Sequence, residues 1–155
     1  MPLNRDFIGR EFSAAEPYEV SRVKIREFAE AIGDPNPVYR SAAAARALGH
    51  PDVLAPPTFA FVVIGTASDQ SPIFDPEFGM RYEFVVHGEQ RFTYHRPIRA
   101  GDVLSVRSRI ADISNAKRNE ILHTGSELRA ADGELVCTAL NVLVSRGTAV
   151  LEETR

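Results

Sequence analysis

The stretch APPTFAFVVIGTAS, residues 55–68, decides the fold. Two prolines stand where the first turn of a helix tolerates them, and the roughly ten residues that follow are apolar on every face. A helix of this kind has to be surrounded, but it is much shorter than the roughly 20 residues that a membrane span requires. We therefore expect protein to surround it, most simply a curved β-sheet.

The second half of the chain supplies the strands of that sheet. A run with strand-like alternation begins at Gln90 and ends at Pro97, and a turn at residues 100–102 separates it from the next run. The next two runs each place four side chains on one face, namely Leu104, Val106, Ser108 and Ile110, then Leu122, Thr124, Ser126 and Leu128. The dipeptide Asp132-Gly133 predicts a tight hairpin before a fourth run. These patterns indicate at least four antiparallel strands.

Two shorter helices are expected before the central one. Ser21 can cap a helix that ends at Gly33, and Ser41 can cap a second, alanine-rich helix. The predicted fold class is therefore α+β, with an antiparallel sheet wrapped around a long buried central helix and extra short helices before it. In this prediction residues 1–147 form a single domain and residues 148–155 form a polar C-terminal tail.

The linker at residues 69–79 joins the central helix to the sheet. It contains two prolines and two phenylalanines, Phe74 and Phe78. We expect it to form an ordered lid in which both phenylalanines are exposed.

The composition excludes several classes of function. The chain has 155 residues, of which 44% are hydrophobic, and this suits one domain with a real core. The formal net charge of -3 comes without a basic stripe, so nucleic acid is not an expected partner. No apolar run has the length of a signal peptide or a membrane span, so we expect a soluble, cytoplasmic protein. Cys137 is the only cysteine, which excludes an internal disulfide and a cysteine zinc site, and the histidines form no metal-ligand cluster.

Four segments of the sequence, taken in order, carry a family resemblance. They are PYEVSRVKIREFAEAIGDPNPVY (17–39), LGHPDVLAPPTFAFV (48–62), VVHGEQRFTYHRPIRAGD (85–102) and ADGELVCTALNVLVSR (131–146). They resemble the single hot-dog domain of MaoC-like (R)-specific hydratases and dehydratases. More narrowly, the chain is similar to the actinobacterial, FAS1-like dehydratase branch, which includes the non-catalytic subunits of (3R)-hydroxyacyl-ACP dehydratases. The resemblance implies a hot-dog fold for the whole chain.

The resemblance also implies a chemistry, and one position departs from it. Catalytic members carry a D-x-N-P-x-H motif after the first helix, whose Asp and His act on a 3-hydroxyacyl or 2-enoyl thioester. Elimination of water requires a base, an acid and donors for an enolate-like oxygen. Asp34, Asn36 and Pro37 match the motif, but Tyr39 stands where the histidine should be. A phenol with a reference pKa near 10 is a poor general base.

The start of the central helix departs from the family pattern as well. Catalytic relatives commonly have a His-Gly-Met type sequence there, with a backbone N–H beside the glycine as an oxyanion donor. Pro56, Pro57 and Thr58 occupy these positions, and proline has no N–H, although Thr58 keeps its N–H and hydroxyl. The resemblance thus implies a degenerate catalytic motif at Asp34, Asn36 and Tyr39, inactive on its own. Without the resemblance, the same residues are ordinary turn material.

The predicted substrate-binding residues lie in the first turns of the central helix. They are Pro57, Thr58, Phe59 and Phe61. Such residues are most often core, although the first turn can also line an acyl tunnel. The chemistry needs no metal and no redox cofactor. The phosphates of a carrier group could be bound by scattered arginines, which otherwise form a solvated face: Arg96, Arg99, Arg107 and Arg109.

Three functions follow from these observations. The first is a non-catalytic or weakly catalytic subunit of an (R)-specific 3-hydroxyacyl-thioester dehydratase or enoyl hydratase. It would supply dimer surface and acyl channel to a MaoC-like catalytic subunit with an intact Asp/His motif, with acyl-CoA or acyl-ACP as substrate. The second is a stand-alone homodimeric hydratase or thioesterase that uses Asp34. The third is an acyl-thioester-binding module without chemistry.

Overall fold

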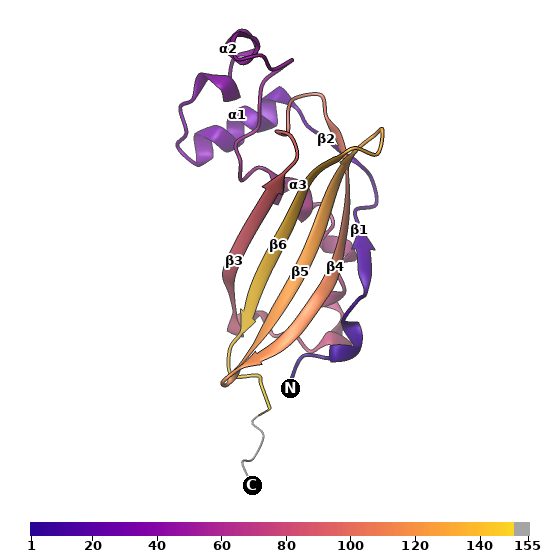
Figure 1. Ribbon diagram of the computed structural model, residues 1–155. Coiled ribbons are helices and arrows are strands. Elements are labelled where there is room, and N and C mark those ends of the chain that lie inside the picture. The colour runs from indigo at the N-terminus through magenta and orange to yellow at the C-terminus, as the bar shows by residue number, and fades with distance from the viewer. Residues whose placement is uncertain (151–155) are drawn as a thin grey trace.

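The computed structural model describes residues 1–150, and its centre is one antiparallel sheet. The strand order is β1-β4-β5-β6-β3, and β2 pairs with the first two residues of β4. The strands are β1 (Glu11–Ser13), β2 (Tyr18–Glu19), β3 (Val85–Tyr94), β4 (Val103–Ala116), β5 (Asn119–Ala130) and β6 (Leu135–Ser145). Figure 1 shows that the four long strands form a curved sheet with α3 (Ala60–Gly65) against one face. The predicted α+β class is confirmed.

The strand alternation follows the predicted pattern. In β4 the side chains of Leu104, Val106, Ser108 and Ile110 are all buried. β4, β5 and β6 are joined in succession by short turns, as antiparallel neighbours allow. At Gly133 the backbone φ is +90°, a value that glycine adopts without a steric cost, and the predicted Asp-Gly hairpin between β5 and β6 lies there. The hairpin between β4 and β5 turns at Lys117, which is the one non-glycine residue with positive φ in the described part of the chain.

The central helix corrects the prediction in two respects. The regular part of α3 has six residues rather than about ten, because three β-branched residues and Gly65 give it low helix propensity. Single 3-10 turns continue the helical path on both sides, for example with the N–H of Phe61 donating to Thr58 O at 3.1 Å. The helix is also not surrounded: Phe59, Ala60 and Val63 are buried, but Phe61 is 50% exposed. One chain therefore covers only one side of α3.

The other helices gather at one end of the sheet, beside the end of β3 (Figure 1). Both predicted caps are confirmed: Ser21 accepts from the N–H of Lys24 at the start of α1 (Arg22–Ala31), and Ser41 caps α2 (Ala42–Ala47) in the same way. Short 3-10 turns complete the fold, with bounds Arg5–Phe7 (η1), Pro37–Tyr39 (η2), Ser68–Gln70 (η3), Pro72–Phe74 (η4), Pro76–Phe78 (η5) and Tyr82–Phe84 (η6).

The linker between α3 and the sheet is only partly as predicted. Phe74 is exposed and stacks on Tyr82 with ring centroids 5.4 Å apart. Phe78, expected to be exposed, is instead fully buried against Phe7, because the N-terminal segment folds over it. That segment is held by buried Glu120, which accepts from the N–H of Leu3 at 2.9 Å and from Arg5 at 2.8 Å.

The domain limits stay a prediction. Of the predicted tail, residues 151–155 lie outside the described residues. The N–H of Ala149 donates to Arg118 O at 3.2 Å, so the first part of the tail is attached to the β4–β5 hairpin. Within residues 1–150, none of the helices has the length and apolar character needed to cross a bilayer.

Candidate functional site

A pocket of about 390 Å³ lies where the small helices meet the end of β3. It brings together parts of three segments that are far apart in the sequence: the motif loop, the approach to α3, and the turn after β3. The lining residues are Val38, Tyr39, Leu54, Ala55, Pro57, Tyr94, His95, Arg96, Pro97 and Ile98. Most of the lining is apolar, which suits an acyl group more than a charged ligand.

The motif loop uses two of its predicted catalytic side chains for its own geometry. Asp34 Oδ1 accepts from the N–H of Asn36 at 3.0 Å, and Asn36 Oδ1 accepts from the N–H of Val38 at 3.1 Å. These are local turns in which an Asx side chain replaces a backbone acceptor. Arg40 closes the loop by donating to the backbone oxygen of Asp34 at 3.2 Å. Asp34 and Asn36 therefore shape the loop that presents Tyr39 to the pocket.

Tyr39 is half-buried in the pocket wall. Burial, and secondly the negative charge of Asp34, raise the pKa of Tyr39 above its ordinary value of 10.0. The phenol therefore stays protonated at neutral pH and cannot accept a proton from a substrate.

At the start of α3, a side chain from the sheet bonds the backbone of Pro57. The hydroxyl of Tyr94, at the end of β3, donates to the carbonyl oxygen of Pro57 at 2.5 Å. Burial raises the pKa of Tyr94, so this hydroxyl keeps its proton. Pro57 thus lines the pocket, as predicted for a substrate-binding residue, but its own polar group is already bonded.

The other three predicted substrate-binding residues lie in different surroundings. Phe59 is fully buried and packs edge-on against Phe28, with ring centroids 5.5 Å apart, so it belongs to the core. Thr58 is exposed at the start of α3. Phe61 lies on the open side of the helix and stacks on His87 of β3 at 5.9 Å. Of the four, only Pro57 lines the same pocket as Tyr39.

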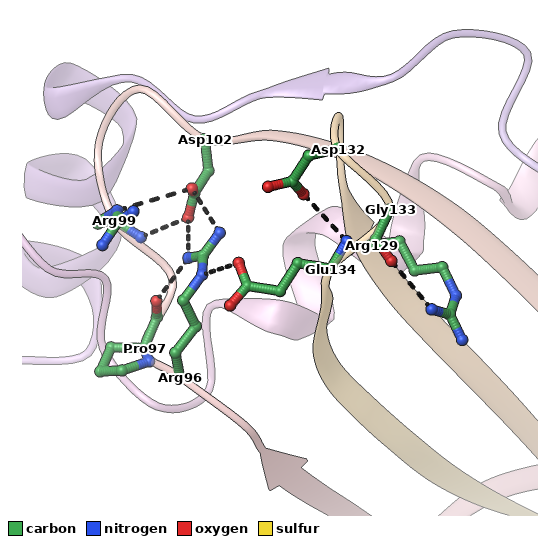
Figure 2. A network of polar contacts seen from close by, with 8 residues as sticks. All are labelled: Arg96, Pro97, Arg99, Asp102, Arg129, Asp132, Gly133 and Glu134. Carbon is green, nitrogen blue, oxygen red and sulfur yellow. Dashed lines mark hydrogen bonds and ion pairs between the residues drawn. The ribbon is translucent and has the colours of Figure 1, made fainter.

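An ion-pair network holds the β3–β4 turn beside the pocket (Figure 2). Arg96 donates through both terminal nitrogens to Asp102, at 2.9 and 3.0 Å, and through Nε to Glu134 at 2.7 Å. The two side chains are largely buried, 15% exposed for Arg96 and 7% for Asp102. Asp102 also accepts from the N–H of Arg99 at 2.9 Å. Arg96 is therefore a structural residue and not a free phosphate contact, and Figure 2 shows it turned toward Asp102.

Sequence reasoning missed Tyr94 and His95 as pocket residues. Tyr94 is the last residue of β3, and His95 follows it directly. Their position at the end of a strand run was the only signal in the sequence. His95 is exposed and lines the same pocket as Tyr39. Among residues 1–150 there is no group of three or more His, Cys, Asp or Glu side chains that could hold a metal ion. The pocket wall is mostly apolar, and the phenol at the position expected for the motif histidine is protonated at neutral pH.

Comparisons with known proteins identify the family of the chain. Residues 6–139 match the family model described as the FAS1-like, dehydratase domain region. A UPF0336 protein of Thermobifida fusca is 50% identical over 149 residues, which cover 96% of this chain and 97% of that protein.

Two solved structures are similar to the chain in three dimensions. One is the C-terminally truncated HadBC (3R-hydroxyacyl-ACP dehydratase) complex from Mycobacterium tuberculosis, with a TM-score of 0.81 and 30% identity over 92% of this chain and 99% of that chain. The other is the ChsH1-ChsH2 complex from the same organism, with a TM-score of 0.68 and 27% identity over 90% of this chain and 89% of that chain. The chain thus belongs to the FAS1-like dehydratase-domain family and has the hot-dog fold of the MaoC-like dehydratases.

Proposed function

We propose that this chain is the non-catalytic subunit of an (R)-specific 3-hydroxyacyl-thioester dehydratase or enoyl hydratase. Its partner is a MaoC-like chain that carries the complete Asp/His motif. The observation that carries the proposal is Tyr39, which stands at the position of the family's histidine. Its side chain lies in the pocket wall and is a phenol whose pKa is raised above 10.0.

The chemistry of elimination supports this division of roles. A general base has to lose its own proton at working pH, and its best pKa lies near that pH. A phenol with a pKa above 10.0 is ionised in fewer than about one molecule in a thousand at pH 7. Pro57 adds a second departure, because it offers no N–H where the family commonly has an oxyanion donor. A partner would therefore supply the base.

The free edge of the sheet supports a partner of the same fold. β3 pairs with β6 on one side only, and none of its ten residues is fully buried. An unpaired strand edge is a liability that a second sheet removes by continuing the ladder. Phe61 of α3, 50% exposed, lies beside His87 of this edge strand. Both similar structures are described as complexes, which also favours a partner subunit.

In the proposed complex this chain contributes dimer surface and part of the acyl channel. The pocket beside Tyr39 is mostly apolar, as a channel for an acyl group requires. The substrate is an acyl-CoA or an acyl-ACP, and a cytoplasmic location is part of the same proposal. Without the partner, the open edge favours a homodimer.

A second candidate function rests on His95. This exposed side chain lines the same pocket as Tyr39, so it could replace the missing histidine in a stand-alone homodimeric hydratase or thioesterase. His95→Gln separates the two candidates, because it abolishes turnover only if the chain is itself the enzyme.

The test compares the same substitution in the two subunits of the co-expressed complex. Asp34→Asn keeps the oxygen that accepts from the N–H of Asn36, so the loop geometry is preserved. We expect hydration of a short 2-enoyl-CoA to change less than about twofold. The corresponding Asp→Asn change in the partner's motif should reduce turnover by roughly 10²-fold or more, as the loss of acid/base catalysis does. A large loss from Asp34→Asn would contradict the proposal.

A further inference from the structure

Three cationic side chains lie at one end of the sheet, and we call them the cationic end. Lys117 and Arg118 form the turn between β4 and β5, and Arg146 directly follows β6. Backbone bonds join these segments to each other and to the start of β3. The N–H of Ala149 donates to Arg118 O at 3.2 Å, and the N–H of Arg146 donates to Phe84 O at 3.0 Å. In Figure 1 this end lies opposite α1 and α2.

The cationic end carries charge that the described residues do not neutralise. All three side chains are exposed, and no carboxylate between residues 1 and 150 forms an ion pair with any of them. The two nearest carboxylates along the neighbouring strands already have partners, since Glu120 pairs with Arg5 and Glu83 pairs with Arg81. Three positive charges at one end are therefore available to an anion.

The free edge of β3 decides what lies beside this end in a complex. The opposite edge of the sheet is formed by β1, which has only three residues, so the ten-residue β3 is the edge that a second sheet can continue at length. A partner of the same fold that uses its own β3 is related to this chain by an approximate two-fold axis. Such an axis makes the two edge strands antiparallel, as all neighbours in this sheet are. The start of one β3 then lies beside the end of the other.

This pairing brings the cationic end to the partner's pocket. In this fold the end of β3 borders the motif pocket, because Tyr94 is the last residue of the strand and lines that pocket. The start of β3 borders the cationic end, because Val85 pairs with Ser145 and Ser145 pairs with Glu120, near the β4–β5 turn. Two strand spacings, roughly 10 Å, separate that turn from the free edge.

The substrate of the partner carries an anion at a distance from its reacting end. In both CoA and ACP thioesters the acyl group is attached to a pantetheine arm whose far end carries a phosphate. An apolar pocket suits the acyl end, whereas the phosphate has to stay in solvent at the pocket mouth. Exposed lysine and arginine side chains are the usual protein ligands of such a phosphate, and they attract it over several ångströms.

We propose that Lys117, Arg118 and Arg146 bind the phosphate of the pantetheine arm of a thioester whose acyl end lies in the partner's pocket. This inference rests on the proposed function and deepens it, because it gives the supporting subunit a part in substrate binding. Phosphate binding and proton transfer are then divided between the two chains.

The test uses the co-expressed complex and two substrates that differ by one phosphate, crotonyl-phosphopantetheine and crotonyl-pantetheine. The variant combines Arg118→Gln and Arg146→Gln with Lys117→Asn, since asparagine tolerates the φ of +58° at that position. We expect KM for the phosphorylated substrate to rise about tenfold, because exposed charge pairs contribute modestly and three are lost together. The kcat should change less than twofold, and KM for crotonyl-pantetheine should stay the same. Crotonyl-CoA and crotonyl-ACP, compared in the same way, show which carrier supplies the phosphate.

The matched control removes the same charge elsewhere on the chain. Arg26, Arg46 and Arg109 are exposed, lie away from the cationic end and form no ion pair within residues 1–150. Their triple change to glutamine should leave KM for both substrates unchanged.

Three results would overturn the inference while leaving the proposed function standing. They are an unchanged KM for the phosphorylated substrate, an equal rise in the control, and an equal rise for both substrates, which would mean that the cationic end acts on assembly and not on the phosphate. A wild-type complex without turnover would remove the proposed function as well. If the thermal midpoint shows that the triple variant is unfolded, Arg118→Gln alone replaces it, with an expected rise in KM of about twofold.

Discussion

At the scale of single residues, Tyr39 is the departure from the expected D-x-N-P-x-H motif that bears most on the proposed role. A histidine has a reference pKa of about 6.5, so it is available as a base near neutral pH. The reference pKa of tyrosine, about 10, is about three units above neutral pH. The structure increases that difference, because burial and the charge of Asp34 raise the pKa of Tyr39. The neighbouring motif residues keep their turn-forming role, with Asp34 and Asn36 both bonded to backbone N–H groups. Asp34 and Asn36 therefore hold the loop in shape around Tyr39.

Another buried residue predicts how stability depends on pH. Burial raises the pKa of the Cys137 thiol from 9.0 to about 11. Since the folded pKa is the higher one, the unfolded chain loses this proton first as pH rises, and stability present below pH 9 is lost between pH 9 and 11. We expect the free energy of unfolding to fall in this window by about 2 kcal/mol more in the wild type than in Cys137→Ala. Urea unfolding under reducing conditions at several pH values measures this, and parallel curves would contradict it.

At the scale of elements, the turn between β3 and β4 depends on one carboxylate. Asp102 holds Arg96 with two hydrogen bonds and is nearly buried. Removing one partner of a buried pair leaves an uncompensated charge, so Asp102→Ala should destabilise the fold by about 3 kcal/mol.

The matched control for Asp102→Ala is Glu127→Ala, which breaks the Glu127–Arg129 pair on the exposed face of the sheet. Exposed pairs contribute about 0–1 kcal/mol. Chemical denaturation of both variants compares the two pairs. Equal losses would show that the Arg96 network has no special structural role.

The elements also show what a sequence can predict. The four long strands, the Asp-Gly hairpin and both serine caps depend on local patterns and are confirmed, although β3 begins at Val85 rather than at Gln90. The length of α3 was wrong because an apolar run predicts burial and not helical geometry, and β-branched residues compete with the helix. The burial of Phe78 and the pairing of Arg96 with Asp102 and Glu134 depend on contacts across the fold, which alternation does not contain. For the same reason, only the structure places Tyr94 and His95 beside Tyr39.

At the scale of the whole molecule, α3 is covered by the sheet on one side only. The sheet covers one side of α3, β3 has a free edge, and Phe61 is half-exposed beside His87. Phe61→Asp should therefore leave the isolated chain folded, with a thermal midpoint near that of the wild type. It should weaken association with the partner by at least about tenfold, because a charge would be buried in the interface.

Leu48→Asp is the control for Phe61→Asp, since Leu48 is 68% exposed and lies after α2 at the far end of the molecule. Co-purification and analytical ultracentrifugation of the complex compare the two variants. Unchanged association in Phe61→Asp, or an equal loss in both, would mean that the open side of α3 is not the interface.

The measurement that tests the central claim most directly is hydration of a short 2-enoyl-CoA by the purified chain alone and by its co-expressed complex with a MaoC-like chain bearing the intact motif. We predict turnover only in the complex, eluting as one species that contains both chains. Turnover by the chain alone at a rate similar to that of the complex would contradict the account and make His95, Asp34 and Tyr39 the residues to substitute first.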